Sequence, residues 1–520
     1  MRIRLVLALS AGLALWLAFP SHDLWPLAPV GVGLLALATR DVSARRGLLL
    51  GLVTGLAFFL PVLSWSGVYV GKTPWIALAV LESLYVALVG GASALLQRAP
   101  SLAGAPRVRP LAIALLWVGQ EALRDRTPFG GFPWARLAFS QADSPLVHLA
   151  ALGGAPAVTF GVALVGAVAA AAVSRLGWAG TGRGLTLRHG GRPVTGLGRA
   201  VPVLGLAGAL LLAPLLVPTP TDGTPARFMA VQGNVPEPGL DFNAERRAVL
   251  DNHVAVTRAA AASVDAGAQP HPDLVVWPEN SSDIDPLRNA DAAVVINSAL
   301  TAVRAPIVVG AVLEGPGAHI SNVSLLYRPG QGVTQRYVKQ HPVPFAEYIP
   351  FRSFFRHLSD KVDLVRADMA AGSGSEVFRV PAASGGTVAA GPVICFEVAY
   401  DDLMRDTVRA GANVLLVQTN NATFGYTDES EQQLAISRVR AVEHGRSIVH
   451  VSTVGVSALI TPEGTAHQQS ALFTSALLAG ELPLRTASTV ADRAGGWPEY
   501  LACGAVLLLL LLRLVPRRRR

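Results

Sequence analysis

Three side chains of the kinds that acyl transfer needs occur in one stretch of this sequence. They are a carboxylate at Glu279 (Val-Trp-Pro-Glu-Asn), an ammonium at Lys339 (Tyr-Val-Lys-Gln-His) and a thiol at Cys395 (Val-Ile-Cys-Phe-Glu). A thiolate is a nucleophile, a carboxylate can accept its proton, and an ammonium can stabilise an oxyanion. Each residue follows an apolar run, so each is expected near a strand end, where α/β folds collect reactive side chains. The pattern predicts a thiol acyl-transfer site.

Each of the three residues also has a plain structural explanation when it is taken alone. A single Cys after an apolar run is commonly a buried thiol that packs as a small hydrophobe. Glu279 could cap a helix, and Lys339 could be a solvated surface cation. The catalytic interpretation is favoured because all three occur together in comparable settings.

The segment 226–485 alternates short β-rich runs with stretches of helical periodicity. The pattern predicts strands at 227–232, 274–277, 306–310, 323–327, 334–338, 391–395, 414–417 and 448–452. It predicts helices at 243–264, 399–409 and 429–444. Such alternation is typical of a layered α/β domain. We therefore expect a domain at 226–485 in which Glu279 and Cys395 converge at strand ends.

The composition is too apolar for an ordinary soluble enzyme. The chain has 520 residues, of which 51% are hydrophobic and 15% charged, and its mean hydropathy is +0.43. These values predict a membrane protein with a soluble domain. The formal charge of +8 does not indicate a nucleic-acid partner, because the arginines lie mostly between apolar runs and at the C-terminal end, where membrane topology accounts for them.

Cys395 and Cys503 are the two cysteines of the chain. Cys503 lies in the last apolar run, so we expect no disulfide between them and two free thiols. His341 stands alone, and neither His-x-x-x-His nor Cys-x-x-Cys spacing occurs. The sequence therefore predicts neither a metal site nor a cofactor.

Eight apolar stretches have lengths that approach or reach the roughly 20 residues of a membrane-spanning helix. They lie near 5–19, 25–39, 48–70, 75–96, 111–123, 146–173, 201–217 and 500–515. The first two are short and close together, so they could also be one broken segment. We expect about seven spans in an N-terminal membrane region, 1–220, and one span in 498–520, which ends in an Arg-rich tail.

Positive charge predicts the orientation of these spans, because Lys and Arg near span ends are retained in the cytoplasm. Arginines cluster before the first span, after the second, fourth and sixth spans, and in the tail 517–520. Both termini are therefore expected in the cytoplasm. Because an odd number of spans precedes the soluble domain, that domain is expected on the extracytoplasmic side.

One outside connection, residues 128–136, mixes aromatic residues, turn formers and a cation. Its Trp134 is consistent with an aromatic belt at the bilayer surface, where Trp is enriched. It is equally consistent with a lipid-facing loop beneath an active site, in contact with substrate. The sequence leaves both interpretations open.

The contexts of the three reactive residues resemble those of the carbon–nitrogen hydrolase, or nitrilase, superfamily. Members carry a Glu-Lys-Cys triad in this order, in Pro-Glu, Lys and Cys-Phe-Glu contexts. Residues 420–425 (Asn-Asn-Ala-Thr-Phe-Gly) and 438–443 (Arg-Val-Arg-Ala-Val-Glu) are similar to further motifs of the superfamily. The resemblance covers the whole soluble domain and implies a nitrilase-like αββα layered sandwich.

The full chain resembles the apolipoprotein N-acyltransferase family, which combines a multi-span helical membrane bundle, an extracytoplasmic nitrilase-like domain and one closing span. Residues 131–134, 231–236 and 339–350 are similar to motifs of that family. Many members carry a Trp shortly after the second of these motifs, whereas this chain reads Gly-Leu-Asp-Phe and leaves Phe242 as the substitute. The resemblance implies a monomeric, multi-pass protein of the bacterial cell membrane.

The same resemblance implies a reaction. A fatty acyl chain would pass from a membrane phospholipid to the α-amino group of the N-terminal S-diacylglyceryl-cysteine of apolipoproteins, in ping-pong fashion through a thioester. Cys395 would be the nucleophile, Glu279 the proton acceptor and Lys339 the oxyanion stabiliser.

Four further residues are candidates for supporting or substrate-binding roles, namely Glu347, Glu397, Phe396 and Trp134. Glu347 would orient Lys339 or help to bind the amine, and Glu397 would shape the substrate site. The alternative for both glutamates is a structural one, a salt bridge or an exposed charge at a strand end.

Two other interpretations remain open. A membrane-anchored amidase or nitrilase would use the same triad on a small extracellular amide, but it gives no reason for eight spans. A receptor or transporter with an inactive domain would not need an intact triad. Transport pathways also usually need ionisable residues inside the spans, and here Glu82 and Glu121 are the exceptions to an apolar pattern.

Overall fold

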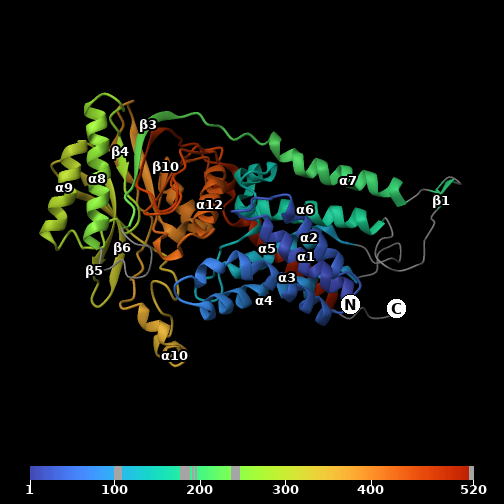
Figure 1. Cartoon of the computed structure of the whole chain (residues 1–520). Coiled ribbons are helices and arrows are strands. Elements are labelled where there is room, and N and C mark those ends of the chain that lie inside the picture. The colour runs from blue at the N-terminus through green and yellow to red at the C-terminus, as the bar shows by residue number, and fades with distance from the viewer. Residues whose placement is uncertain (99–107, 176–187, 190–191, 194–195, 236–245, 515–520) are drawn as a thin grey trace. The chain divides into compact units, whose positions relative to one another are not determined.

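A computed structural model of the chain describes residues 1–98, 108–175, 188–189, 192–193, 196–235 and 246–514 (Figure 1). The chain divides into two compact units. The helical unit comprises Met1–Gly67, Lys72–Pro218 and Ala494–Arg520, and the sheet unit comprises Val68–Gly71 and Thr219–Arg493. Phe242 lies outside the described residues.

Each of the eight predicted apolar stretches coincides with a helix of the helical unit. These helices are α1 (Arg2–Leu17), α2 (Leu27–Ala38), α3 (Ala44–Val62), α4 (Lys72–Gln97), α5 (Pro110–Arg124), α6 (Ala150–Arg175), α7 (Gly196–Leu212) and α14 (Trp497–Leu514). Among the described residues, three helical segments are long and apolar enough to cross a membrane, Ala44–Val62, Lys72–Gln97 and Pro145–Ser174. The count of eight spans therefore stays a prediction.

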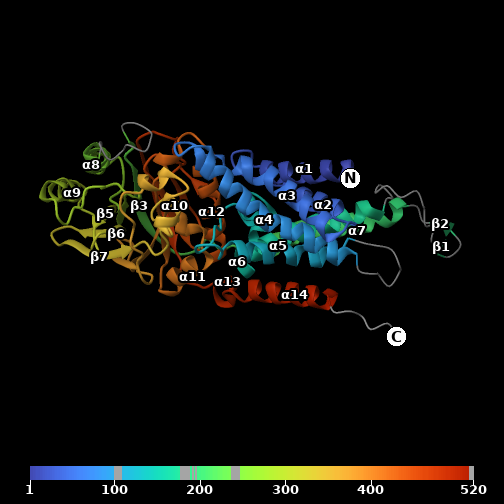
Figure 2. The same cartoon turned by 90° about the horizontal axis from the view of Figure 1, so that it is seen from below.

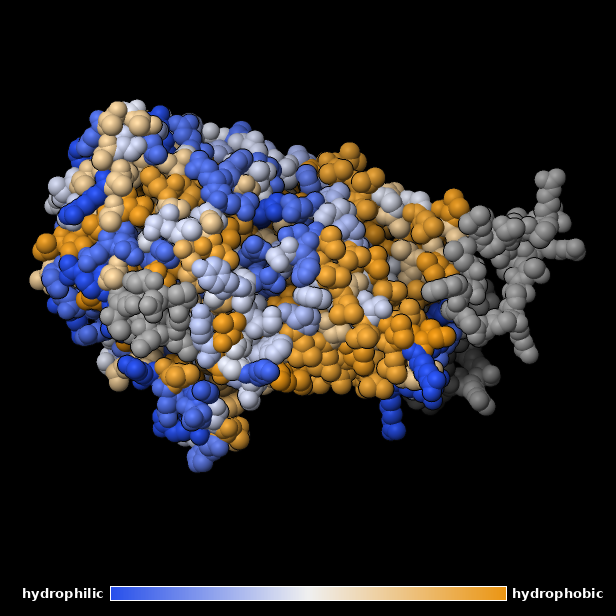
Figure 3. Space-filling model, viewed as in Figure 1, coloured by the Kyte–Doolittle hydropathy of each residue, from blue (hydrophilic) through white to orange (hydrophobic). Residues whose placement is uncertain are grey.

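Hydrophobic residues cover much of the surface of the helical unit on the face shown in Figure 3. Large apolar side chains such as Leu84, Leu88 and Leu508 are about half exposed or more. An apolar surface of this extent is expected of a protein that lies in a bilayer, where lipid tails cover it.

Helices α3 and α4 pack with their backbones in close contact. A Cβ atom added at Gly47 would lie 2.4 Å from the carbonyl oxygen of Gly90, and one added at Gly51 would lie 2.4 Å from that of Val86. Larger residues would force the helices apart. Small residues at such contacts are typical of helix packing in membranes, where close backbone approach replaces the hydrophobic effect.

The sheet unit contains two six-stranded sheets. The first has the order β14-β3-β4-β5-β6-β7, with β3 (Thr224–Gln232), β4 (Leu274–Val276), β5 (Ile307–Glu314), β6 (Ile320–Arg328), β7 (Gly332–Val338) and β14 (Ala476–Leu484). The second has the order β13-β12-β11-β10-β9-β8, with β8 (Phe378–Pro381), β9 (Thr387–Ile394), β10 (Val414–Thr419), β11 (Ser447–Ser452), β12 (Ala458–Ile460) and β13 (Ala466–His467).

The two sheets face each other across a shared core and carry helices on their outer faces. Side chains from strands of both sheets, including Phe228, Val276, Phe378, Ile394 and Leu416, form one buried cluster. Helices α8 (Arg246–Asp265) and α9 (Ala290–Val303) cover the first sheet, and α11 (Asp401–Arg409) and α12 (Glu429–His444) pack on the second. Figures 1 and 2 show these layers. The predicted αββα sandwich is confirmed.

The central strands of each sheet run parallel. Strand β4 pairs in parallel with β3 and β5, and β10 pairs in parallel with β9 and β11. The carboxyl ends of parallel neighbours meet at one edge of a sheet, and this brings the residues after β4, β9 and β10 together.

The observed elements differ from the sequence-based prediction in a few places. The strand predicted at 391–395 ends at Ile394, and Cys395 begins the short 3₁₀ turn η7 (Cys395–Ala399). The helix predicted at 243–264 is described from Arg246 onward. Helix α9 and strands β8, β12, β13 and β14 were not predicted.

Candidate active site

Cys395 stands at the turn after strand β9 with a left-handed backbone. Its φ is +54°, a conformation that residues other than Gly adopt rarely and at a cost of about 1–2 kcal/mol. Strain of this kind persists where the surroundings hold it in place, and it is concentrated at active sites. The turn places the sulfur just beyond the carboxyl end of β9.

Arg440 of helix α12 holds this turn. Its guanidinium donates hydrogen bonds to the carbonyl oxygens of Val398 (2.9 Å) and Ala399 (2.7 Å). The charge is balanced by Asp401 and Glu443, each 2.6 Å away. The fully buried Arg440 therefore fixes the backbone that follows Cys395.

Glu279 enters the site from the loop after β4. This loop lies against β5, where a Cβ at Gly310 would be 2.1 Å from the carbonyl oxygen of Pro278, so only glycine permits the approach. Oε2 of Glu279 accepts a hydrogen bond from the backbone N–H of Asn420 (2.8 Å), and its carbonyl oxygen accepts one from the Thr453 hydroxyl (3.0 Å). The loop and the carboxylate are thus both anchored to the second sheet.

Lys339 follows strand β7 and is 1% exposed. Its ammonium donates to Oε1 of Glu347 (2.6 Å) and to Oε1 of Glu279 (3.2 Å). Asn322 of β6 donates through Nδ2 to the same two oxygens, at 2.6 Å for Glu279 and 3.4 Å for Glu347. Two carboxylates and one ammonium therefore form a buried cluster with an amide as its fourth member.

Glu397 ties the turn after β9 to the chain that follows Lys339. Its Oε1 accepts from the backbone N–H groups of Gln340 (2.6 Å) and His341 (3.1 Å). Its Oε2 accepts from the backbone N–H of Ile394 (2.8 Å) and from the Tyr337 hydroxyl (2.9 Å). With four donors and no exposure, this carboxylate fixes the turn at Cys395 relative to the segment that follows Lys339.

Two polar groups contact the sulfur of Cys395 directly. The Thr419 hydroxyl at the end of β10 lies 3.4 Å from Sγ, and Nε2 of Gln433 on α12 lies 3.6 Å from it. Neither residue was singled out in the sequence, and neither was Asn322. Thr419 directly precedes the recognised motif at 420–425, so its place at a strand end was a signal that could have found it.

The proton affinities of the cluster follow from burial and from neighbouring charges. Burial raises the pKa of Glu279, and the Lys339 ammonium opposes this shift. Burial alone would lower the pKa of Lys339, but Glu279 and Glu347 raise it well above its usual range. Burial, reinforced by Glu279, raises the pKa of the Cys395 thiol, and Lys339 opposes this. A protonated thiol beside a carboxyl of raised proton affinity is the arrangement that general-base catalysis needs.

Phe396 is buried and packs edge-on against Tyr400, with ring centroids 5.8 Å apart. Tyr400 in turn stacks on His341 at 4.4 Å. The aromatic residues thus pack beside the two segments that Glu397 joins.

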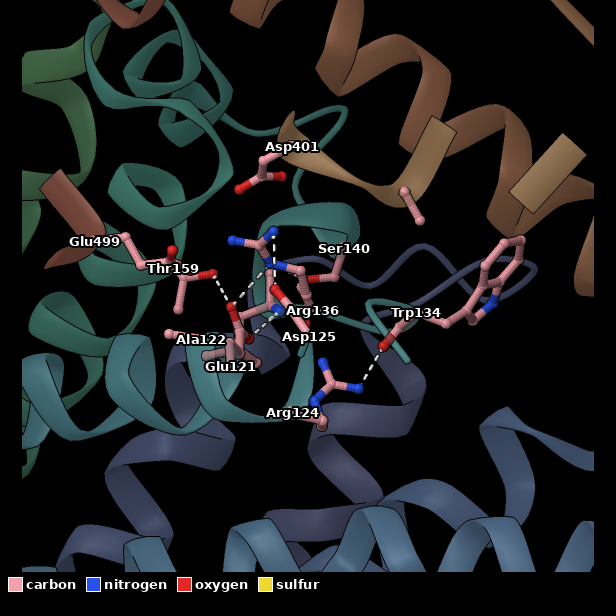
Figure 4. Close-up of polar contacts among 12 residues, drawn as sticks. Glu121, Ala122, Arg124, Asp125, Trp134, Arg136, Ser140, Thr159, Asp401 and Glu499 are labelled. Carbon is pink, nitrogen blue, oxygen red and sulfur yellow. Dashed lines mark hydrogen bonds and ion pairs between the residues drawn. The ribbon is translucent and has the colours of Figure 1, made fainter. Parts of the chain in front are cut away.

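Trp134 belongs to the helical unit, whereas the three residues of the triad belong to the sheet unit. Its ring meets Trp65 edge-on at 5.6 Å, and its carbonyl oxygen accepts a hydrogen bond from Arg124 at 2.6 Å (Figure 4). Arg124 also pairs with Glu82 at 3.0 Å. The substrate-binding role of Trp134 stays a prediction.

A second ion cluster holds the same segment of the helical unit. Arg136 pairs with Asp125 (3.1 Å) and Glu121 (3.4 Å), and the Thr159 hydroxyl donates to Glu121 at 2.7 Å (Figure 4). The loop after α5 is therefore fixed by two buried arginines, each neutralised by acids. Within the described residues no group of three or more His, Cys, Asp or Glu suited to a metal ion is found.

Comparison with known proteins identifies two matching family models. Residues 11–168 match the apolipoprotein N-acyltransferase N-terminal domain, and residues 230–492 match carbon–nitrogen hydrolase. The second match covers the triad and all the residues that contact it.

Relatives match along nearly the whole chain. An apolipoprotein N-acyltransferase of Mycolicibacterium smegmatis is 40% identical over 99% of this chain and 86% of its own length. One of Pseudomonas putida is 30% identical over 98% of this chain and 96% of its own length. Among solved structures, an amidase from Nesterenkonia sp. covers 54% of this chain and 97% of its own, with a TM-score of 0.39 and 17% identity.

The N-terminal and hydrolase-type models match in the order that the architecture requires, and the identity to the relatives extends from one end of the chain to the other. The apolar helices of the helical unit agree with a membrane protein. The chain belongs to the apolipoprotein N-acyltransferase family.

Proposed function

We propose that this membrane acyltransferase moves a fatty acyl chain from a phospholipid to the α-amino group of the diacylglyceryl-modified N-terminal cysteine of apolipoproteins. The relatives are named for N-acyl transfer to apolipoproteins. The observation that carries the proposal is the cluster of Glu279, Lys339 and Glu347, in which the charges of Glu279 and Lys339 act on the thiol of Cys395.

In the first half-reaction, Cys395 Sγ attacks the ester carbonyl carbon of the phospholipid while Glu279 takes the thiol proton. Lys339 stabilises the oxyanion that forms, and a donor of this kind is typically worth about 10²–10³ in rate. The ester C–O bond then breaks, and Glu279 returns the proton to the departing alkoxide. The products are a thioester on Cys395 and a lysophospholipid.

In the second half-reaction, the amine of the apolipoprotein attacks the thioester carbonyl. Glu279 accepts the proton of the amine, the C–S bond breaks, and the proton passes to the Cys395 thiolate. The amide is formed and the free enzyme returns. Glu347, bonded to the Lys339 ammonium, keeps that cation in place through both steps and contributes a second negative charge toward the incoming amine.

A thioester exposed to water would hydrolyse, so this reaction requires a site that excludes water and admits an acyl tail. The burial of Glu279, Lys339 and Glu397 supports such a site. We propose that Phe396 and Trp134 help to shape it, and that Glu397 acts by fixing the turn that carries the nucleophile.

We further propose that the catalytic domain, residues 226–485, faces the extracytoplasmic side of the bacterial cell membrane and that both termini are cytoplasmic. The membrane region would comprise residues 1–220 with a closing span in 498–520, and the protein would act as a monomer. The basis for the orientation is the clustering of arginines after alternate apolar segments and in the C-terminal tail.

The test is an intact-mass measurement of the purified full-length protein after incubation with phospholipid in detergent. The proposal predicts a mass increment of one acyl chain, lost again when a diacylglyceryl peptide with a free α-amino group is added. Cys395→Ala should show no increment. Ammonia release from simple amides without any acyl increment would favour an amidase, and an increment that survives in Cys395→Ala would refute the assignment of the nucleophile.

A further inference from the structure

Two polar side chains that the reaction described above does not use lie against the nucleophilic sulfur. The Thr419 hydroxyl and the Gln433 amide nitrogen are 3.4 Å and 3.6 Å from Sγ of Cys395. Both residues are buried, and they come from different elements, strand β10 and helix α12. Sulfur is a weak acceptor as a thiol, but it becomes a charged acceptor as a thiolate.

The Gln433 amide is held in one orientation by contacts at its other end. Its Oε1 accepts hydrogen bonds from the Thr419 hydroxyl (2.8 Å) and from Nδ2 of Asn421 (3.1 Å). Asn421 also donates to Glu429 (2.6 Å), and its Oδ1 accepts from the Ser452 hydroxyl. Because the oxygen of Gln433 is occupied by donors, the atom that faces the sulfur is the NH₂ nitrogen, which can only donate.

The Thr419 hydroxyl has one hydrogen and two acceptors within reach. They are Oε1 of Gln433 at 2.8 Å and the Cys395 sulfur at 3.4 Å. While the sulfur is a neutral thiol, the amide oxygen is the better acceptor. When the sulfur becomes charged, a hydrogen bond to it is roughly twice as strong as a neutral one, and rotation of the hydroxyl transfers the donor to sulfur.

We propose that Thr419 and Gln433 are catalytic residues that donate two hydrogen bonds to the Cys395 thiolate each time it forms. In the first half-reaction the S–H bond breaks, its proton goes to Glu279, and the sulfur electron pair forms the S–C bond. In the second, the S–C bond breaks and the sulfur keeps the pair until Glu279 returns the proton. The proposal rests on the proposed role of Cys395 as nucleophile.

The surrounding charges explain why neutral donors matter here. The groups that act electrostatically on the sulfur are Glu279 and Glu429, which oppose its ionisation, and Lys339, which favours it. Lys339 is already shared by Glu279 and Glu347. Neutral hydrogen-bond donors add stabilisation for the thiolate without adding a charge that the carboxylates would neutralise.

The experiment measures how fast iodoacetamide alkylates Cys395 as a function of pH, in the full-length protein with Cys503→Ala so that one thiol remains. Thr419→Val keeps the shape of the side chain and removes its donor, and Gln433→Leu removes the amide. Each is expected to slow alkylation at fixed pH about ten- to hundredfold, the range for loss of one hydrogen bond to a charged group. The midpoint of the pH profile should move upward by about one unit or more.

Two control variants separate this effect from general damage. Thr419→Ser retains the hydroxyl and should restore most of the parental profile. Ser437→Ala lies one turn further along α12, where the Ser437 hydroxyl contacts Nδ1 of His450 at 2.9 Å, and it should leave the profile unchanged. Thermal unfolding identifies any variant that does not fold. If Gln433→Leu does not fold, the alkylation profile of Thr419→Val alone tests the proposal.

The proposal is overturned if folded Thr419→Val and Gln433→Leu show the parental pH profile and the parental rate of acyl-enzyme formation. An effect on stability with an unchanged profile would make both residues structural and would also overturn it. The underlying function is tested separately by the parent protein. If the parent forms no acyl-enzyme, the role of Cys395 is refuted. If the parent forms it and the variants behave like the parent, only the roles of Thr419 and Gln433 are refuted.

Discussion

Two of the buried charge clusters in the described part of the chain use different cations. In the helical unit, Arg124 pairs with Glu82, and Arg136 pairs with Glu121 and Asp125. In the candidate active site of the sheet unit, the cation is a lysine, Lys339, which is shared by Glu279 and Glu347. Both sets are almost fully buried, yet they are built for different purposes.

The difference lies in what the cation can do. A guanidinium cannot lose its proton and offers five donors in a fixed plane, so it suits permanent attachment of backbone and carboxylates. Arg124 uses these donors on Glu82 and on the carbonyl oxygens of Phe132 and Trp134. The arginine set of the helical unit therefore holds the backbone after α5 in place, and this role requires no proton transfer.

The lysine cluster is arranged so that protons can move. Two carboxylates share one ammonium, and the thiol beside them keeps its proton because burial and Glu279 raise its pKa. Glu279 is thus left with a raised pKa and a proton donor within electrostatic reach. The comparison teaches that a buried charge cluster suits catalysis when its groups can exchange protons. A cluster built on arginine, which keeps its proton, suits structural stabilisation instead.

The largest expected effect is a loss of activity when the lysine cluster is changed at Glu279. Glu279→Gln keeps the size of the side chain and the acceptor for Asn420 but removes the base, so the rate of acyl-enzyme formation should fall about 10²–10⁴-fold. Unfolding stability should fall by about 1–3 kcal/mol, because the amide NH₂ that replaces Oε1 cannot accept the hydrogen bonds of Lys339 and Asn322. Single-turnover kinetics and thermal unfolding in detergent measure the two quantities. Retained activity would place the base elsewhere.

The next effect should appear in stability. Arg124→Met leaves Glu82 as a buried carboxylate without its cation, which typically costs about 3–5 kcal/mol. Glu82→Leu combined with Arg124→Met should recover much of this loss, because no isolated charge remains. Molecules that stay folded should lose far less of the rate of acyl-enzyme formation than Glu279→Gln does, because Arg124 takes no part in proton transfer. A large loss of rate in folded Arg124→Met would show that the arginine cluster is needed for catalysis as well as for stability.

The pH dependence of the acylation rate should be set by the lysine cluster, and within it by Glu279. Because the pKa of Glu279 is raised in the folded protein, its basic form is lost as the pH falls through that raised value. The acylation rate should therefore drop about tenfold for each pH unit below it and level off above it. Lys339 stays charged throughout, because its pKa is raised as well. Rapid-quench measurements from pH 5 to 9 should show this limb in the parent and not in Glu279→Gln.

The smallest effect concerns Glu429, a buried carboxyl. It accepts a hydrogen bond from Asn421, which also donates to Gln433, and Gln433 contacts the Cys395 sulfur. Burial raises the pKa of Glu429 to about 8, so the folded state holds a proton that the unfolded state releases above its ordinary value of 4.5. Stability should therefore decline as the pH rises between these values and stay level above about 8.

Glu429→Gln has no proton to lose, so its stability relative to the parent should grow over that interval, by about 1–3 kcal/mol. Unfolding midpoints at pH 5 and pH 8.5 measure the difference. An equal midpoint difference at both pH values would mean that Glu429 is ionised in the folded protein.

Lys339 follows a mixed run, 334–338, that becomes the edge strand β7, whereas the strand-end positions of Glu279 and Cys395 were predictable because each follows a continuous apolar run that becomes a buried central strand. Asn322 was not predictable, although it donates to Glu279 and Glu347. It lies inside β6 opposite Val312 of β5, and only the antiparallel register of β5, β6 and β7 brings it to the cluster. Register between strands is a tertiary property that local sequence patterns do not contain.

The missed elements have similar reasons. Strand β14 contains Gly480 and Pro483, which are unfavourable in strands, and it is stabilised by pairing with the distant strand β3. Helix α9 has a β-branched run, Val294 to Ile296, that favours a strand by propensity, and its packing on the first sheet decides otherwise. Gln433 was hidden because α12 is buried on nearly all sides, so its polar residues do not mark a solvent face.

The left-handed backbone at Cys395 limits which side chains position 395 can carry. Serine fits the conformation about as well as cysteine does, but threonine does not, because β-branched residues at positive φ are true outliers. Glycine would relieve the strain and abolish the chemistry. Cys395→Gly should therefore unfold at a higher temperature than the parent while forming no acyl-enzyme.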